Sequence, residues 1–295
     1  MAKQPVPLAG RVVVITGGGR GIGACTAALL AAEGARVVIG DLDEGLARET
    51  AAGLGRDVQG LPLDVTDHAG FTAVLDLVER DLGPIDVLVN NAGIMPINRI
   101  EDETAAAAHA QVAVNFLAVV HGTKEMVRRW KARDAAGHVV NISSAAGRVP
   151  IAGAATYSGT KFAVSGFSNA LHTEFRADRT PIAITAVHPA IVRTDLSKGF
   201  KDTKAVQPVT PEDVAAAVVD VLKFPRPDVY VPKSMGTAVK VGALFPRAVG
   251  DWLNRVLGGE RAALDAIDSP DRRAYEDRVA RSAPGAEKAE KEMTA

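Results

Sequence analysis

The sequence contains a single cysteine, Cys25, among 295 residues. One thiol cannot close a disulfide within the chain, and the first residues, MAKQPVPLAG, lack the apolar segment of a secretion signal. No uninterrupted apolar run has the roughly 18 residues that a membrane span needs. These absences predict a protein of the reducing cytoplasm with no transmembrane span.

The chain also lacks an excess of charge of either sign. Its formal net charge is −1, which argues against a nucleic-acid partner. No glycine-rich loop ends in the Gly-Lys-Ser/Thr of an ATP-binding loop, so the sequence does not indicate an ATPase. No metal site is expected.

Apolar stretches of strand length alternate with segments of helical spacing. Most of the strand candidates are continuous in Val, Ile and Leu, as is typical of strands buried on both faces of a parallel sheet. The alternation predicts a doubly wound α/β fold with a mostly parallel sheet and helices on both faces. Strands are predicted at residues 11–16, 35–41, 58–63, 85–90, 137–142, 182–188 and 228–231. Helices are predicted at residues 24–33, 44–54, 69–82, 104–131, 156–177 and near 210–222.

This pattern predicts one dinucleotide-binding and catalytic domain over residues 1–235. Residues 236–295 are predicted to form a C-terminal helical extension that ends in a charged, mobile tail. Residues 195–207 are expected to form a mobile lid over the substrate.

The stretch TGGGRGIG at residues 16–23 lies between a predicted strand and a predicted helix. Glycines here allow a sharp turn, a close approach of the backbone to a pyrophosphate, and tight packing of helix on strand. The helix N-terminus offers unpaired N–H groups to the phosphates. The spacing is G-x-x-x-G-x-G, and the predicted cofactor contacts are Gly17, Gly19, Arg20, Gly21, Ile22 and Gly23.

Further cofactor contacts are predicted where the next strands end. Asp41 can accept hydrogen bonds from the adenosine ribose hydroxyls and would repel a 2′-phosphate, which favours NAD; Asp43 is a weaker rival for this role. Arg20 could pair with that phosphate, so NADP stays possible. Other predicted contacts are Leu42, Asp64 and Val65 (toward the adenine), and the small residues Asn91, Ala92 and Gly93.

The stretch YSGTK places Tyr157 and Lys161 one helical turn apart, on one face. A phenol with a pKa near 10 is a weak base at neutral pH, but a cation within about 4–6 Å favours the phenolate. Lys161 is therefore expected to lower the pKa of Tyr157 and make it a general acid/base. Ser144, just after the fifth strand, is expected to hold a substrate oxygen, and Asn115 is a polar residue in an apolar helix.

Together these motifs resemble the short-chain dehydrogenase/reductase family over residues 8–234, through TGGGRGIG, Asp64-Val65, NNAG, Asn115, Ser144, YSGTK and HPAIVRT. The resemblance implies a seven-stranded Rossmann-type sheet, an Asn115–Ser144–Tyr157–Lys161 tetrad, and hydride transfer between a nicotinamide and an alcohol or carbonyl. It implies that Lys161 also holds the nicotinamide ribose and that Asn115 holds a water of a proton relay. It further implies cofactor contacts at Pro189, Ala190, Ile191 and Thr194. Ala190 stands where the family usually has glycine, which puts the local backbone angle in question.

The substrate is predicted to be a hydrophobic secondary alcohol or ketone, such as a steroid, retinoid or lipid. Its pocket residues are expected to be Ser144, Met95, Pro96, Val149, Ile151 and Leu196. A sugar or polyol and a 3-oxoacyl thioester are alternative substrates. A dinucleotide-binding sensor or scaffold without turnover is the alternative function. The family's habit suggests a homodimer or homotetramer.

Overall fold

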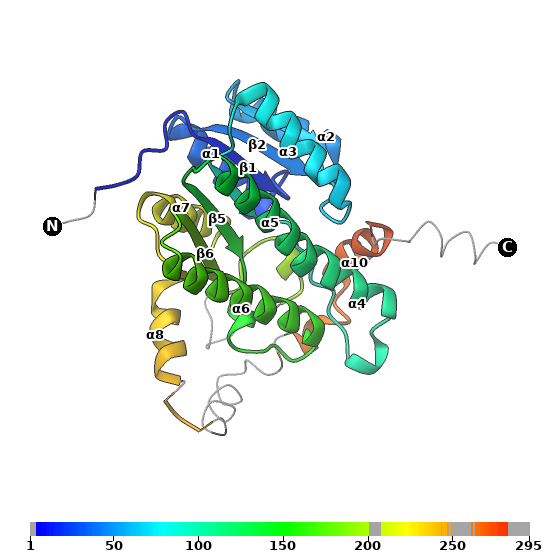
Figure 1. Ribbon diagram of the computed structural model, residues 1–295. Helices are drawn as coiled ribbons and strands as arrows, with labels where there is room; N and C mark the ends of the chain where they lie inside the picture. The colour runs from blue at the N-terminus through cyan, green and yellow to red at the C-terminus, as the bar shows by residue number, and fades with distance from the viewer. Residues whose placement is uncertain are drawn as a thin grey trace.

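The computed structural model describes residues 4–200, 208–242, 244–246, 248, 261 and 263–282. Seven parallel strands form one sheet in the order β3-β2-β1-β4-β5-β6-β7 (Figure 1). The strand order reverses between β1 and β4, which is where ligands bind in open α/β sheets. The predicted doubly wound, Rossmann-type fold is confirmed. The strands are β1 Val12–Thr16, β2 Arg36–Asp41, β3 Val58–Pro62, β4 Val87–Asn90, β5 Gly137–Ile142, β6 Ile182–Pro189 and β7 Asp228–Val231.

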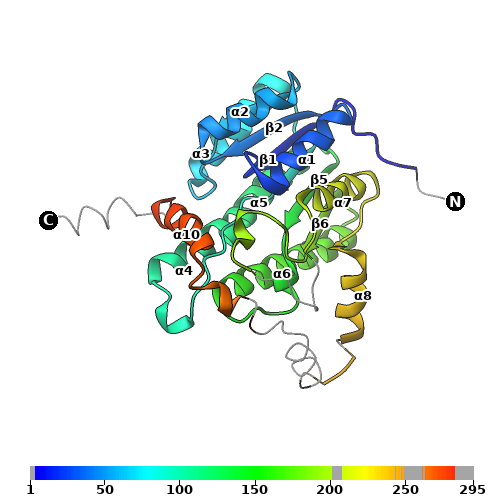
Figure 2. The same cartoon turned by 180° about the vertical axis from the view of Figure 1, so that it is seen from behind.

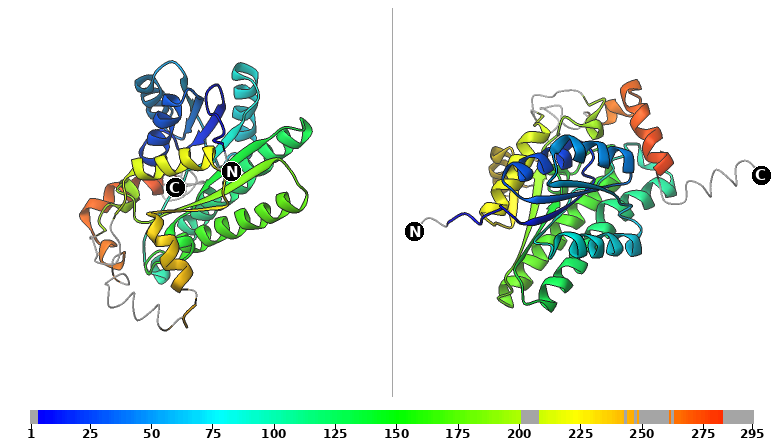
Figure 3. Two further views of the ribbon diagram at one scale, coloured as in Figure 1. Left: turned by 90° about the vertical axis from the view of Figure 1, so that its left-hand side faces the viewer. Right: turned by 90° about the horizontal axis from the view of Figure 1, so that it is seen from above.

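Helices cover both faces of the sheet (Figures 2 and 3). The helices α1 (Gly21–Ala32), α2 (Glu44–Leu54) and α7 (Pro211–Lys223) pack on one face, over a core rich in valine. The helices α3 (His68–Leu82), α5 (Ala118–Ala132) and α6 (Ala155–Ala177) pack on the other face. Strands buried between two apolar layers need continuous apolar sequence, as the β1 residues VVVIT illustrate.

Side-chain caps fix where several helices begin. The Thr210 hydroxyl accepts a hydrogen bond from Asp213 N at 3.2 Å, and Pro211 follows as the first residue of α7. Asp43 caps α2 by accepting from Leu46 N at 3.0 Å, and Asp67 caps α3 in the same way. These caps set the positions of the loops that precede the helices.

The predicted helix at residues 104–131 is interrupted in the structure. It consists of α4 (Ala105–Val112), a π-helical turn (Ala113–Leu117) and α5. The stretch Ala105–Ala132 is long and apolar enough to cross a membrane by length and composition, a test that core helices of sheet proteins also pass. Here Met126 and Trp130 of α5 are fully buried against the sheet, which is the arrangement of a core helix.

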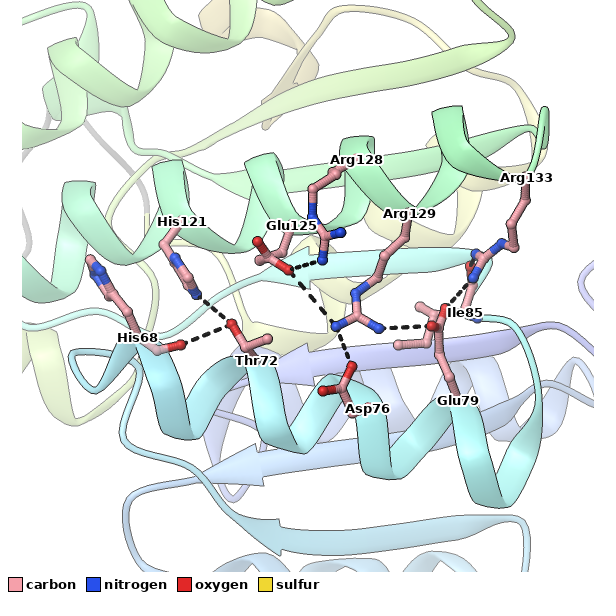
Figure 4. Close-up of polar contacts among 10 residues, drawn as sticks. All are labelled: His68, Thr72, Asp76, Glu79, Ile85, His121, Glu125, Arg128, Arg129 and Arg133. Carbon is pink, nitrogen blue, oxygen red and sulfur yellow. Dashed lines mark hydrogen bonds and ion pairs between the residues drawn. The ribbon is translucent and has the colours of Figure 1, made fainter.

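A polar network joins α3 to α5 (Figure 4). Arg129 contacts Asp76 at 2.5 Å and Glu79 at 2.8 Å, and Arg133 contacts the other oxygen of Glu79 at 2.5 Å. At the start of α3, the Thr72 hydroxyl lies 3.2 Å from a ring nitrogen of His121. These contacts tie α3 to α5, which packs against β4 and β5.

Beyond β7 the chain forms α8 (Lys233–Gly242) and, further on, a short turn of helix at Leu264–Ala266 and α10 (Pro270–Ser282). Figure 1 shows α8 and α10 on opposite sides of the molecule. The helix α8 contains residues 235 and 236, between which the domain boundary is predicted. The division into two domains stays a prediction. The predicted tail and residues 201–207 of the predicted lid lie outside the described residues.

Candidate active site

A cavity of about 1390 Å³ opens where the parallel strands end. The glycine-rich stretch and the residues after β2 and β3 line one part of it. Ser144, Tyr157 and Lys161 line another part, together with the loops after β4 and β6. A single cavity therefore brings most of the sequence-predicted cofactor residues and three of the four predicted catalytic residues together.

The glycines of the loop after β1 are required by close packing. Gly17 has a φ of +63°, and a Cβ there would lie 2.8 Å from the Ala92 Cα. A Cβ on Gly23 would lie 2.4 Å from the Gly17 carbonyl oxygen, so Gly23 lets α1 pack against the loop. Gly17, Arg20, Gly21 and Ile22 line the cavity, whereas Gly19 and Gly23 do not.

The carboxylate of Asp41 is held on the cavity wall by two backbone donors. One oxygen accepts from Gly19 N at 2.9 Å, and the other accepts from Asp43 N at 3.2 Å. Arg20 lies nearby, with its guanidinium 4.0 Å from Asp43 and 3.7 Å from Asp195. Gly19 thus contributes through its bond to Asp41. The site combines a fixed negative charge with a partly exposed positive one.

The residues after β3 and β4 also lie on the cavity wall. Asp64, Val65, Asn91, Ala92 and Gly93 line it, as does Leu42 after β2. Asn91 ties the end of β4 to the end of β1, because its amide donates to the Thr16 and Gly17 carbonyls at 2.9 and 2.8 Å. This bond pair holds the glycine loop against the loop after β4.

Ser144 and Tyr157 meet at the other part of the cavity. A hydrogen bond between the Ser144 and Tyr157 hydroxyls opposes the rise in the Tyr157 pKa that burial produces. Lys161 is 5 % exposed and its Nζ lies 5.6 Å from the centre of the Tyr157 ring. The Lys161 ammonium donates to the Ile142 carbonyl at 2.9 Å.

Burial dominates the titration of both Tyr157 and Lys161. It raises the pKa of Tyr157 and lowers the pKa of Lys161 to about 8. Burial opposes the charge on each group and the Ser144 hydroxyl favours the phenolate, so the expectation that Lys161 lowers the Tyr157 pKa stays a prediction.

Asn115 lies behind this wall rather than on it. Its side chain accepts from Ile94 N at 2.9 Å and donates to the Ile94 carbonyl at 2.8 Å. A Cβ on Gly93 would lie 3.3 Å from the Asn115 oxygen and 3.6 Å from Lys161 Nζ, so both side chains converge on that glycine. Asn115 therefore fixes the loop after β4, and the π-helical turn presents it there.

The end of β6 and the loop after it line the cavity with all four of the predicted residues, Pro189, Ala190, Ile191 and Thr194. Ala190 keeps an ordinary backbone, because Asp134 and Arg179 are the non-glycine residues with positive φ in the described part of the chain. The alanine is thus accommodated without strain. The Thr194 methyl faces Gly21, 3.4 Å from where a Cβ of that glycine would stand.

Comparison with known proteins agrees with this geometry. A family model described as short chain dehydrogenase matches residues 11–205. The chain belongs to the short chain dehydrogenase family. Members of this family are oxidoreductases, so the site is that of an oxidoreductase.

Two relatives of this short chain dehydrogenase carry named activities. The chain is 36% identical over 210 residues to the trans-4-hydroxycyclohexanecarboxylate dehydrogenase of Sinomonas cyclohexanicum, and the match covers 68% of this chain and 80% of that protein. It is 35% identical over 190 residues to the 3-alpha-(or 20-beta)-hydroxysteroid dehydrogenase of Mycobacterium bovis, covering 64% of this chain and 72% of that protein. A short chain dehydrogenase/reductase of Burkholderia phymatum, solved in complex with NAD, has the same fold with a TM-score of 0.73. That match is 24% identical and covers 80% of this chain and 93% of the other.

The wall beside Tyr157 in this short chain dehydrogenase is apolar. Met95, Val149, Ile151 and Leu196 line the cavity as predicted, whereas Pro96 does not. Within the described residues no three His, Cys, Asp or Glu side chains are grouped as a metal site. Phe200 of the predicted lid also lines the cavity. Lining residues that the sequence interpretation missed include Ala110, Val114, Met235, Ala263, Tyr275, Arg278 and Val279.

Four of those missed residues belong to the chain beyond residue 235. The sequence gives them no motif, since their segment is charged and rich in alanine. A signal does exist in the helical spacing of Tyr275 and Val279, which puts both on one face of α10.

Proposed function

We propose that this short chain dehydrogenase interconverts a secondary alcohol and its ketone on an apolar skeleton. It prefers NAD, and Tyr157 is its general acid/base. The supporting observation is that Ser144, Tyr157 and Lys161 line the same cavity as the glycine loop and Asp41. Candidate reacting groups and a loop fit for a dinucleotide thus line one cavity.

The loop after β1 fits a dinucleotide. Gly17 and Gly21 have φ values of +63° and +55°, so the backbone of the loop adopts conformations that side chains rarely allow. Gly21 also begins α1, whose first N–H groups can bind a pyrophosphate. Asp41 would hold the adenosine ribose, and a bound oxidised nicotinamide would supply the hydride acceptor. Because the Asp41 carboxylate is fixed, we favour NAD; Arg20 keeps NADP as the alternative.

The reacting residues have complementary properties. The Ser144 hydroxyl positions the substrate oxygen, and the Tyr157 oxygen next to it exchanges the proton of the alcohol. Burial raises the pKa of Tyr157 and lowers that of Lys161 to about 8, so each charged form is costly alone. A phenolate and an ammonium formed in the same buried space stabilise each other, which couples their titrations.

Asn115 acts as a positioning residue. It holds Ile94 by two hydrogen bonds and thereby fixes the loop that faces Lys161. The water relay that the family resemblance implies would start from this side of the lysine.

The apolar wall favours a hydrophobic substrate over a sugar, a polyol or a 3-oxoacyl thioester. Met95, Ile97 and Tyr157 form a buried cluster with Ala146 and Ala154. The named relatives carry dehydrogenase names for a hydroxylated cyclohexane and a hydroxysteroid, which supports an alicyclic alcohol. A homodimer or homotetramer stays a prediction.

The experiment is a comparison of Tyr157→Phe with wild type. The variant keeps the ring but loses the proton-exchanging oxygen, so turnover of cyclohexanol-type alcohols should fall by about 10²–10⁴-fold. NADH binding, followed by fluorescence, should not change. Tyr230→Phe is the matched control, since that ring stacks on His188 outside the cavity.

Near-normal turnover by Tyr157→Phe would contradict the assignment of the general acid/base. Tight NADH binding by the wild type without turnover of any alcohol or ketone tested would favour the alternative, a sensor or scaffold.

A further inference from the structure

The helix α10 returns to the active site after the chain has left the sheet. Tyr275, Arg278 and Val279 of α10 line the cavity, and Ala263 just before it does so as well. The helix α8 packs against β7, lies on the other side of the molecule from α10 in Figure 1, and contributes Met235 alone to the cavity. The described end of the chain is therefore part of the site wall.

Tyr275 is the aromatic residue that α10 contributes to this wall. It is 4 % exposed, and its hydroxyl accepts a hydrogen bond from Met95 N at 2.7 Å. Burial raises the pKa of Tyr275, and Tyr157 is close enough to raise it further. Tyr275 therefore keeps its phenol proton, and its uncharged side chain forms part of the cavity wall near Tyr157.

Arg272 fastens α10 to two loops at once. Its side chain is 1 % exposed, and its guanidinium donates to the Leu196 and Lys198 carbonyls at 2.7 and 3.2 Å and to the Met95 carbonyl. The same guanidinium pairs with Glu276 at 2.6 Å. Leu196 and Met95 belong to the loops after β6 and β4, so one buried cation ties both loops to α10.

Two further contacts reinforce this attachment. Glu276 accepts from Ile97 N at 3.3 Å, and Arg278 pairs with Asp195 at 2.9 Å. A buried guanidinium with a partner on each of its three nitrogens is costly to remove, because those partners would be left unpaired. The position of α10 is therefore well determined, and a substrate must fit beneath it.

The part of the cavity next to Tyr275 and Val279 has mostly apolar lining residues. They are Met95, Ala146, Ile151, Leu196 and Phe200, beside Tyr157. We propose that α10 limits the size of the substrate skeleton and that Tyr275 is the specificity-determining residue. This inference rests on the proposed function. It narrows the substrate to an apolar alicyclic alcohol whose ring system ends at Tyr275.

The test compares two alcohols that differ in size, cyclohexanol and decahydro-2-naphthol. Removing the Tyr275 ring should open space for the second ring of the larger alcohol. Tyr275→Ala should raise the ratio of kcat/KM for the larger over the smaller alcohol by about tenfold or more, the range that such apolar contacts give. Tyr275→Phe keeps the ring and should leave the ratio within about threefold of wild type.

Two controls make the test specific. Arg273→Ala changes an exposed residue of the same helix and should not alter the ratio. Tyr275→Leu keeps more of the buried volume and replaces the alanine variant if that one does not fold, as judged by circular dichroism. The inference would be overturned if the kcat/KM ratio of the larger to the smaller alcohol is unchanged in the folded Tyr275→Ala or Tyr275→Leu variant. It would also be overturned if Arg273→Ala changes that ratio as much.

A binding measurement separates this inference from the proposed function. The shift in melting temperature caused by 2-decalone relative to cyclohexanone is measured in the presence of NADH. If 2-decalone raises the melting temperature of Tyr275→Ala more, relative to cyclohexanone, than it does for the wild type, and no turnover is seen, the size limit set by Tyr275 is supported and the proposed dehydrogenase activity is contradicted. Turnover with unchanged size selection would contradict the wall alone, and a wild type that neither binds nor converts any of these compounds would overturn both.

Discussion

The substitution Asp41→Asn tests the cofactor preference most directly. Asp41 ends β2, and its carboxylate accepts from Gly19 N at 2.9 Å and from Asp43 N at 3.2 Å. Asparagine has nearly the same shape and keeps one acceptor for the shorter of these bonds. The substitution therefore removes a charge from the cavity wall with little change in packing.

The magnitude follows from the charge on the ribose 2′-phosphate of NADPH, which is about −1.5 to −2 near neutral pH. Two unit charges about 4 Å apart interact by about 1 kcal/mol in water and about 4 kcal/mol at an effective dielectric constant of 20. Because Arg20 lies nearby and is partly exposed, we take the lower part of this range, about 2 kcal/mol. Since about 1.4 kcal/mol is tenfold, the wild type should bind NADH about 30-fold more tightly than NADPH.

The assay is a fluorescence titration with NADH and with NADPH at low and at high salt. Asp41→Asn should bring the two dissociation constants within about threefold, and salt should narrow the wild-type difference because exposed charges are screened. Asp43→Asn is the matched control, since Asp43 also lines the cavity and asparagine caps a helix as well as aspartate does. Equal binding of both cofactors by the wild type would refute the reasoning, and a larger shift in Asp43→Asn would assign the role to Asp43.

Two further predictions concern stability. Gly137→Ala should lower the free energy of unfolding by about 1–3 kcal/mol, because a Cβ there would lie 2.1 Å from the fully buried Trp130 ring. Urea unfolding measures this, with Gly166→Ala as the control because a Cβ on Gly166 meets no other atom within 4 Å. Equal stability of the two variants would contradict the prediction. His138 is buried with its pKa lowered to about 4, so only the unfolded chain binds its proton between pH 6.5 and 4. The contribution of His138 to the free energy of unfolding is present above pH 6.5 and falls by about 1.4 kcal/mol for each pH unit below it, down to about pH 4. His138→Gln should make the free energy of unfolding less dependent on pH between 6.5 and 4, and an unchanged slope would contradict this.

The strands were predictable because burial on both faces demands continuous apolar sequence. The predicted bounds of β5 and β7 agree with the structure, and those of β1, β2, β3 and β6 differ by one residue. The prediction began β4 at Ile85, two residues before the observed start at Val87. The Asp86 backbone still bonds to both neighbouring strands, donating to the Val12 carbonyl at 2.9 Å and accepting from His138 N at 3.1 Å, so the difference is confined to the end of the strand.

The local part of the site was also predictable. Tyr157 and Lys161 share a helix face because of their spacing, and the topology of a parallel sheet brings Ser144 to them. The pKa directions were not predictable, because they depend on burial by residues far away in the sequence. Likewise, the apolar periodicity of residues 104–131 does not reveal the π-helical turn at Ala113–Leu117, which turns Asn115 toward the loop after β4.

The wall formed by α10 was missed for a different physical reason. Its sequence, PDRRAYEDRVARS, is mostly charged and is typical of an exposed helix. Yet Arg272, Tyr275, Glu276 and Val279 follow the spacing i, i+3, i+4, i+7, which is one helix face. That face is buried although half of it is charged, because backbone groups of the loops after β4 and β6 satisfy Arg272 and Glu276. A helix can therefore belong to an active-site wall without an apolar stripe when the neighbouring loops have unpaired carbonyls. For this chain, the spacing of Arg272 and Tyr275 is the feature to compare when substrate size differs among its relatives.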